Sequence, residues 1–208
     1  MNFQNFLIDG PEDAPRTLVL AHGAGGAMDT PFLNIVARGV GERGIRVVRF
    51  EFPYMAARRT GGKSGAPDRQ PVLLQSWRDV VAELGGGEKV VIGGKSLGGR
   101  MATMVADELR VRGVVALGYP FHPPGQQERV RTAHLETLAT RALIVQGSRD
   151  PFGTREEVSA YQLSPTIRIE WLDDGDHSFK PRKASGHTER EHLVRAADVV
   201  AEFVISIT

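Results

Sequence analysis

The sequence contains no cysteine. This absence excludes disulfide bridges, thiolate metal sites and a cysteine nucleophile, and it suits a reducing compartment. No apolar run approaches the roughly 18 residues of a membrane-spanning helix, and residues 1–15 lack the basic start and continuous apolar stretch of a secretion signal. We therefore expect a cytoplasmic protein.

An excess of charge of either sign is missing as well. The 26 Lys and Arg residues nearly balance the 25 Asp and Glu residues, which leaves a formal charge of +1. Such a chain has no global field that draws it to nucleic acid or to a membrane surface, so the expected partner is a small molecule. The length of 208 residues and the 41% apolar composition are ordinary for one α/β domain, which we expect to span residues 1–208. Nothing in the sequence indicates the oligomeric state.

Apolar runs of strand length alternate with stretches of helical periodicity. This alternation predicts a three-layer α/β sandwich with a mostly parallel central sheet of about six to seven strands. The expected strands are 17–21, 45–52, 89–92, 113–117, 142–146 and 167–172, and the expected helices are 31–43, 71–84, 97–110, a short one at 126–138, 154–162 and 189–205.

Two segments between the strands have a distinct character. In the helix expected at 71–84, Leu74, Trp77, Val81 and Leu84 are spaced by three and four residues, which predicts a stripe facing the core. Residues 54–70 are rich in Gly, Arg and Lys and have no periodicity, so they are predicted to form the one long loop.

Gly94-Lys95-Ser96-Leu97-Gly98 is a Gly-x-Ser-x-Gly motif. Hydrolases that work by acyl transfer need a serine hydroxyl pushed out of the fold on a tight strand-to-helix turn, and the flanking glycines leave room for that turn. The motif alone is weak evidence. Here it follows the expected strand 89–92 and opens the expected helix 97–110, so we predict that Ser96 is a nucleophile at the positive end of a helix dipole.

The nucleophile needs a base and an acid. Of the six histidines, His177 is best placed because it directly follows the last expected strand, whereas the others are expected to be solvated or structural. The acid should come between serine and histidine in chain order, at the end of a strand, and Asp150 fits this position. Three other carboxylates are closer to His177 in sequence and are also typical of a polar turn, namely Asp173, Asp174 and Asp176. No second ligand group converges on them, so we expect neither a metal nor a cofactor.

Further residues are candidates for the remaining parts of the site. The N–H groups of Leu97 and of Ala24, in the glycine-rich turn after His22, are the predicted oxyanion-hole donors. Tyr119, Phe121 and His122 follow the strand 113–117 and are candidate walls of a substrate pocket, although caps of the core fit the same position.

Basic side chains could also meet the substrate. Lys95 can point either to the pocket or to solvent. The long loop contains four basic residues, Arg58, Arg59, Lys63 and Arg69. They can attract an anionic substrate, or the loop can simply be solvated and mobile.

Four segments, 22–26, 93–101, 146–153 and 174–179, together resemble the α/β-hydrolase superfamily over nearly the whole chain. The strings GGKSLGGRMA, QGSRDPFG and DGDHSF resemble a small bacterial group related to dienelactone hydrolases and to a chromatin-complex subunit family of eukaryotes. Dienelactone hydrolases use a cysteine nucleophile, so the serine here departs from them and does not imply their lactone substrate. Lids of these hydrolases usually enter after the strand that follows the nucleophile helix, and the short stretch 118–141 implies an open site without a lid domain.

These features predict a serine hydrolase that acts on small soluble esters or thioesters through an acyl-enzyme. Two alternatives stay open at this point. A non-catalytic interaction module can retain the same fold, and a serine acyltransferase can use the same three residues with an acceptor other than water.

Overall fold

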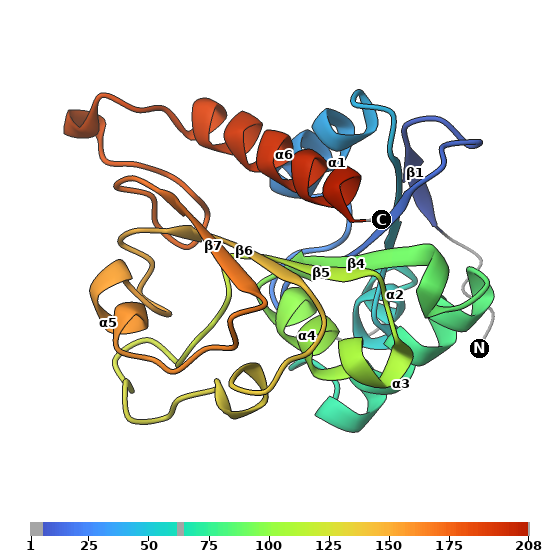
Figure 1. Ribbon diagram of the computed structural model, residues 1–208, viewed down its shortest axis with the longest axis horizontal. Helices are drawn as coiled ribbons and strands as arrows, with labels where there is room; N and C mark the ends of the chain where they lie inside the picture. The colour runs from blue at the N-terminus through green and yellow to red at the C-terminus, as the bar shows by residue number, and fades with distance from the viewer. Residues whose placement is uncertain (1–5, 62–64, 208) are drawn as a thin grey trace.

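A seven-stranded sheet with the strand order β1-β3-β2-β4-β5-β6-β7 forms the centre of the structure (Figure 1). The structure is a computed structural model that describes residues 6–61 and 65–207. β1 pairs antiparallel with β3, and every other neighbouring pair is parallel. The strands are β1 (Leu7–Asp9), β2 (Thr17–Ala21), β3 (Arg46–Phe50), β4 (Val90–Lys95), β5 (Gly113–Leu117), β6 (Ala142–Gly147) and β7 (Ile167–Leu172).

Helices cover both faces of the sheet, which confirms the predicted three-layer α/β architecture (Figure 1). On one face α1 lies beside α6, and on the other α3 packs against α4. The helices are α1 (Pro31–Gly41), α2 (Pro53–Arg59), α3 (Gln70–Glu83), α4 (Leu97–Leu109), α5 (Arg155–Ser159) and α6 (Glu189–Ser206), with short 3-10 turns at Gly87–Lys89, Ala133–Leu135 and Lys183–Ser185. Among the described residues no helix has both the length and the apolar character that crossing a bilayer requires.

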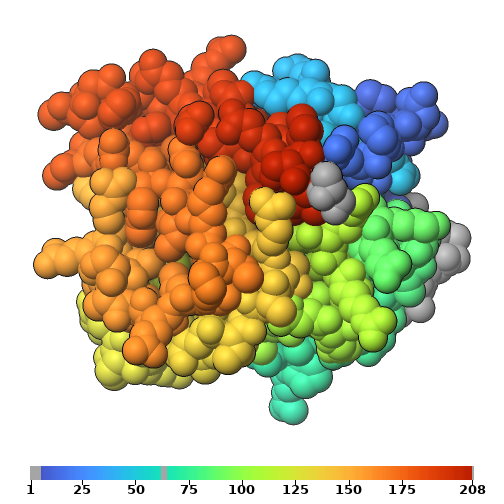
Figure 2. Space-filling model, in the orientation of Figure 1, coloured from blue at the N-terminus to red at the C-terminus, as the bar shows by residue number. Residues whose placement is uncertain are grey.

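The sheet separates two apolar cores, because its inner strands are buried on both faces as parallel strands usually are. On the α3/α4 side, Trp77 is fully buried with its ring centroid 4.8 Å from that of Phe50. The α1/α6 side is filled by aliphatic residues of both helices, such as Val36 and Val200. In the space-filling view, the red and orange C-terminal part of the chain closes the upper left of the molecule next to the light-blue α1 (Figure 2).

Helix ends in this part of the fold are fixed by their own sequence. Thr30 caps α1 through its side chain, and Pro31 occupies the first turn, where a missing N–H costs nothing. Thr188 and Glu191 form a capping box at the start of α6. Both of these helix starts lie close to the candidate site described below.

Some sequence predictions were wrong in detail. β1 was not expected, and the segment 54–70 is not one continuous loop, since α2 occupies its beginning. The helix expected at 126–138 is absent except for the single turn Ala133–Leu135. In α3 the predicted stripe does face the core, since Trp77 and Val81 are buried and Leu74 and Leu84 pack against the core half-buried, and Leu73 and Val80 widen it.

Candidate active site

The site lies where the strand order of the sheet reverses. β2 has β3 on one side and β4 on the other, so the loops that leave β2 and β4 diverge and open a crevice at the carboxyl edge of the sheet. The register pairs Ala21 with Gly94, which brings the turn after His22 next to the Gly-x-Ser-x-Gly motif. This is the position at which open α/β sheets bind their ligands.

Ser96 sits on a strained turn between β4 and α4. Its φ of 49° and ψ of −112° are unusual for a residue with a side chain, and such conformations cost about 1–3 kcal/mol. Close packing keeps the turn in this shape, because a Cβ on Gly98 would lie 2.6 Å from the carbonyl oxygens of both Ala21 and His22. The flanking glycines therefore let the turn pack against the end of β2, and this packing holds Ser96 in its strained conformation.

The structure brings Ser96, His177 and Asp150 together in one hydrogen-bonded chain. His177 Nε2 lies 3.0 Å from Ser96 Oγ, and His177 Nδ1 lies 2.7 Å from Asp150 Oδ2. Asp150 Oδ2 accepts a hydrogen bond from Nδ1–H, so the lone pair on Nε2 is directed at the hydroxyl group. Asp150 is completely buried, whereas 22% of the His177 side chain is exposed.

A glutamine that the sequence reasoning missed holds the acid in place. Gln146 is fully buried near the end of β6, and its Nε2 donates to Asp150 Oδ2 at 3.0 Å and to the carbonyl oxygens of Tyr119 and Gly153 at 3.2 Å. Its Oε1 accepts the N–H of Tyr119 at 2.7 Å, and the other oxygen of Asp150 accepts the N–H of Phe152 at 2.8 Å. The one signal for this residue was an amide at the end of the otherwise apolar run 142–145.

The other three carboxylates shape the loop that carries His177. Asp176 Oδ1 accepts the N–H groups of Ser178 and Lys180, and Asp174 pairs with Arg149 and Arg182. Hydrogen bonds from Arg182 lower the pKa of Asp174 to about 2. Asp173 pairs at the surface with Arg155. Their positions correspond to the polar turn that the sequence allowed, and Asp150 is the carboxylate that meets His177.

The glycine-rich turn after β2 is anchored from behind. His22 is buried, and its Nε2 accepts the N–H of Phe52 while its Nδ1 lies 2.7 Å from the carbonyl oxygen of Gly23. Burial lowers the pKa of His22, which fits a neutral ring that donates through Nδ1. The hydroxyl of Tyr54 lies 3.2 and 3.1 Å from the carbonyl oxygens of Gly23 and Ala24. Because a trans peptide directs its N–H away from its carbonyl, the N–H of Ala24 points away from Tyr54.

Leu97 is the first residue of α4, where helix geometry leaves N–H groups without an intrahelical partner. Leu97 thus follows the nucleophile candidate directly, and Ala24 comes from the turn beside it. Ala24 lines the cavity together with Ser96, whereas Leu97 is next to Ser96 in the chain and does not line the cavity itself.

Lys95 turns toward the candidate site rather than toward bulk solvent. Its Nζ donates to the carbonyl oxygen of His177 at 2.6 Å and lies 5.3 Å from the centre of the Phe32 ring. Gly118, at a φ of +68°, makes room for this contact, since a Cβ there would lie 2.8 Å from Nζ and 3.0 Å from the His177 oxygen. Burial lowers the pKa of Lys95 to about 8.

A cavity of about 470 Å³ opens over these residues. Phe152 forms part of its wall and lies against the His177 imidazole, with ring centroids 4.2 Å apart. Its other lining residues come from the turn after β2, the start of α1, the motif after β4, the His177 loop and the start of α6, and they are Gly23, Ala24, Gly25, Gly26, Thr30, Pro31, Phe32, Leu33, Lys95, Ser96, His177, Ser178 and Glu189.

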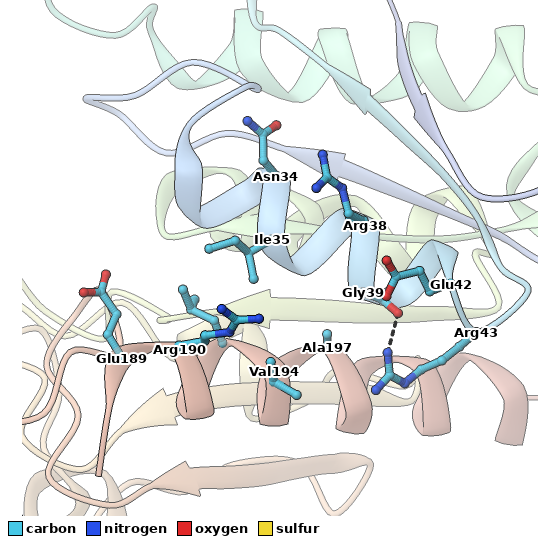
Figure 3. A pocket seen from close by; sticks show the side chains of 11 residues that line it. Asn34, Ile35, Arg38, Gly39, Glu42, Arg43, Glu189, Arg190, Val194 and Ala197 are labelled. Atoms are coloured by element: carbon cyan, nitrogen blue, oxygen red, sulfur yellow. Dashed lines mark hydrogen bonds between the residues drawn. The ribbon is translucent and has the colours of Figure 1, made fainter.

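A larger cavity of about 730 Å³ lies between α1 and α6 (Figure 3). Ile35 and Val194 face it from the two helices, and arginines and glutamates surround them. None of the predicted catalytic residues lines this cavity. The smaller cavity is therefore the candidate active site, because it contains the hydrogen-bonded chain.

Several predicted residues do not reach the candidate cavity. Tyr119, Phe121 and His122 are completely buried and do not line it, so the structure places them in the core instead of the pocket wall. The chain turns inward at Gly118, and the Tyr119 hydroxyl donates to the carbonyl oxygen of Arg131.

Two of the basic residues after β3, Arg58 and Arg59, interact with other parts of the protein. Arg59 is paired with Glu51 and Asp29, and Arg58 lies over the Tyr54 ring at 5.2 Å. Arg69 begins α3 at an exposed position, and Lys63 lies outside the described residues. None of the described loop arginines lines the cavity around Ser96.

A crevice of this kind, built on this sheet, defines an α/β-hydrolase. A family model described as an alpha/beta hydrolase domain matches residues 14–205, and the chain belongs to this family. An alpha-beta serine hydrolase homologue from Coxiella burnetii is similar in structure, with a TM-score of 0.70 and 20% identity over 96% of this chain and 90% of that one.

Two further solved structures are similar. A lidless α/β serine hydrolase from Xanthomonas campestris matches with a TM-score of 0.71 and 19% identity, over 98% of this chain and 90% of that one. A dienelactone hydrolase from Anabaena variabilis matches with a TM-score of 0.72 and 20% identity, over 97% of this chain and 91% of that one. At these identities the likeness concerns the fold, and it confirms the small α/β-hydrolase architecture without a lid domain.

Proposed function

We propose that the protein is a serine hydrolase that cleaves small soluble esters or thioesters through an acyl-enzyme. The observation that carries this proposal is the chain of hydrogen bonds from Asp150 through His177 to Ser96, with heavy-atom distances of 2.7 and 3.0 Å. These distances are within the reach that a general base needs to take the proton of a nucleophile.

In the proposed reaction Ser96 Oγ attacks the acyl carbon while His177 Nε2 takes its proton. Asp150 stabilises the imidazolium, and the N–H groups of Leu97 and Ala24 hold the oxyanion of the tetrahedral intermediate. The imidazolium then gives its proton to the leaving alcohol or thiol. Water, activated by His177, releases the acid and restores Ser96. An open cavity of about 470 Å³ supports a small substrate.

Labelling with a fluorophosphonate tests the nucleophile. The probe should phosphonylate the protein rapidly, and Ser96→Ala should abolish labelling, because only a serine next to a base and oxyanion donors reacts quickly. Ser178→Ala is the matched control, since Ser178 lines the same cavity but has no such base, and this variant should label at the wild-type rate. Absence of labelling in folded protein would refute the proposal and favour a non-catalytic interaction module.

Hydrolysis of short-chain esters and thioesters is the second measurement. Turnover in water without an added acceptor supports a hydrolase. A rate that depends on an added alcohol or amine, with the acyl group found on that acceptor, would identify an acyltransferase instead.

A further inference from the structure

Lys95 presents a positive charge in the wall of the candidate cavity, directly before Ser96 in the chain. Its Nζ has one hydrogen-bond acceptor in the part of the chain that the structure describes, the carbonyl oxygen of His177, although an ammonium carries three N–H donors. Asp150 and Asp176 act on Lys95 only through space, and among the described residues no carboxylate oxygen lies within ion-pair distance of Nζ. Two of its donors are therefore left for another acceptor.

Burial of a charge without a counter-ion is unfavourable, and buried charges are normally paired. Arg49, a buried cation, follows the rule, because it contacts Asp9 at 2.7 Å. Lys95 has instead the faces of Phe32 and Phe179 nearby, at 5.3 and 6.0 Å from their ring centres. The counter-charge that Lys95 lacks inside the protein can be supplied by a ligand in the cavity.

Helix ends add to the positive potential. The first turn of α1, the start of α4 at Ser96 and the first residue of α6 all line the same cavity. The N-terminus of each helix carries a partial positive charge and favours anions. The one carboxylate among the lining residues is that of Glu189, which is exposed to solvent at the start of α6. Solvent screens the repulsion from such an exposed group.

We propose that the cavity selects substrates whose acyl group carries a second, negatively charged end, such as monoesters or monothioesters of dicarboxylic acids, and that Lys95 Nζ binds that end. This inference rests on the proposed function, and it names the substrate class of the same site. Lys95 is then a specificity-determining residue that contacts the substrate rather than the reacting bond.

Two esters of equal chain length test the inference, the p-nitrophenyl monoester of adipic acid and the p-nitrophenyl ester of hexanoic acid. Wild-type protein should show a higher kcat/KM for the adipate ester. Lys95→Met should lower the ratio of the two kcat/KM values by about 10- to 100-fold, the range expected for loss of a charged hydrogen bond. The neutral ester serves as the internal control, because lost support of the His177 carbonyl or poor folding affects both esters equally. Lys180→Met, an exposed lysine near His177 that does not line the cavity, should leave the ratio unchanged.

The pH dependence gives a second measurement. The ratio should fall as the pH rises through about 8, the pKa of Lys95, and this decline should be absent in Lys95→Met. The other titratable groups around Nζ, namely Asp150, Asp176, His177 and Glu189, influence both esters, so the ratio isolates the lysine.

Direct binding separates this inference from the proposed function. In Ser96→Ala, which cannot turn over, calorimetry should detect adipate but not adipamide, and Lys95→Met in that background should weaken adipate binding by a similar factor. Normal labelling and ester hydrolysis with equal kcat/KM for both esters would overturn the charge selection and leave the hydrolase intact. Adipate binding without labelling would support the anion site and overturn the hydrolase.

Discussion

Two carboxylates of this protein approach a basic side chain at the same distance of 2.7 Å and have different consequences. At the β1/β3 edge, Asp9 meets Arg49, whose terminal nitrogens also donate to the carbonyl oxygen of Met28 and the side chain of Asn34. At the carboxyl edge, Asp150 meets His177. The first cation is held by three fixed acceptors, although its Nε has no acceptor among the described residues.

In the second pair, the protein supplies hydrogen-bond partners to the carboxylate, whereas the histidine is only partly enclosed. Asp150 receives three hydrogen bonds, from Gln146, Phe152 and His177, whereas the far nitrogen of His177 faces Ser96 and an open cavity. A buried pair held by fixed acceptors stabilises the fold, while a pair whose histidine faces a cavity is available for chemistry. We therefore expect that breaking the Asp150–His177 pair mainly lowers activity, and that breaking the Asp9–Arg49 pair mainly lowers stability.

Asp150→Asn should have the largest effect. If the amide oxygen stays toward Phe152, the NH₂ group faces both His177 Nδ1 and the Gln146 amide, and His177 must change its tautomer. Nε2 then carries the proton and cannot accept one from Ser96. We expect kcat for ester hydrolysis to fall by about 10⁴-fold, the loss seen when a serine hydrolase keeps its geometry but has the wrong tautomer. A kcat within tenfold of wild type would show that Asp150 is not the acid.

Arg49→Met should break the other pair and produce the opposite pattern. Its removal leaves Asp9, Asn34 and a buried carbonyl without their donor, and loss of one partner of a buried pair costs about 3–5 kcal/mol. Urea unfolding should report this loss. The rate of fluorophosphonate labelling per folded molecule should stay at the wild-type value, because the pair does not line the cavity around Ser96. A matching loss of labelling would mean that the two regions are coupled.

The sequence predicted the chemistry of the carboxyl edge better than its packing. Ser96, His177 and Asp150 were found because strained turns and strand ends leave local signals in the sequence, and the structure brings these three together. Asp150 was preferred over Asp174 by chain order alone. Gln146 belongs to no sequence motif, because its role depends on four hydrogen bonds to three residues that only the tertiary structure brings together.

Elements with weak periodicity were the ones predicted poorly. β1 has three residues and is not fully buried, so its alternation was too short to be noticed. α2 carries Arg58 and Arg59 and buries only Tyr54 and Met55, which resembles a polar loop in sequence. Tyr119 was expected at the pocket wall because it follows a strand, but the left-handed φ of Gly118 turns the chain into the core, and no sequence pattern fixes that direction.

Gln146→Leu should lower activity less than Asp150→Asn does, and it should also lower stability. The apolar side chain leaves the N–H of Tyr119 without its acceptor and the carbonyl oxygen of Gly153 without its Gln146 donor in a fully buried place, and we expect a loss of about 3 kcal/mol in the free energy of unfolding. Asp150 keeps its bonds to Phe152 and His177, so kcat should fall by about tenfold, far less than in Asp150→Asn. Leu143→Ala in the same strand is the stability control, since it should lower the free energy of unfolding by a similar amount without changing kcat. Equal losses of kcat in both variants would show that Gln146 acts only through general packing.

Lys95 belongs to neither kind of pair, since among the described residues its ammonium has no carboxylate partner. Its effect on the free energy of unfolding should be the smallest of those predicted. Burial lowers its pKa to about 8, whereas an unfolded lysine titrates near 10.4. Between these values the unfolded state binds more protons, so the free energy of unfolding should rise with pH over this window, by about 2 kcal/mol or less, and the cost of the buried charge should be fully present below pH 8. Urea unfolding of Lys95→Met should lack this rise, whereas Lys180→Met should retain it.

If adipate occupies the cavity as proposed, it should stabilise the wild-type protein most below pH 8 and flatten the same rise, because the ligand then supplies the counter-charge that Arg49 already has in Asp9.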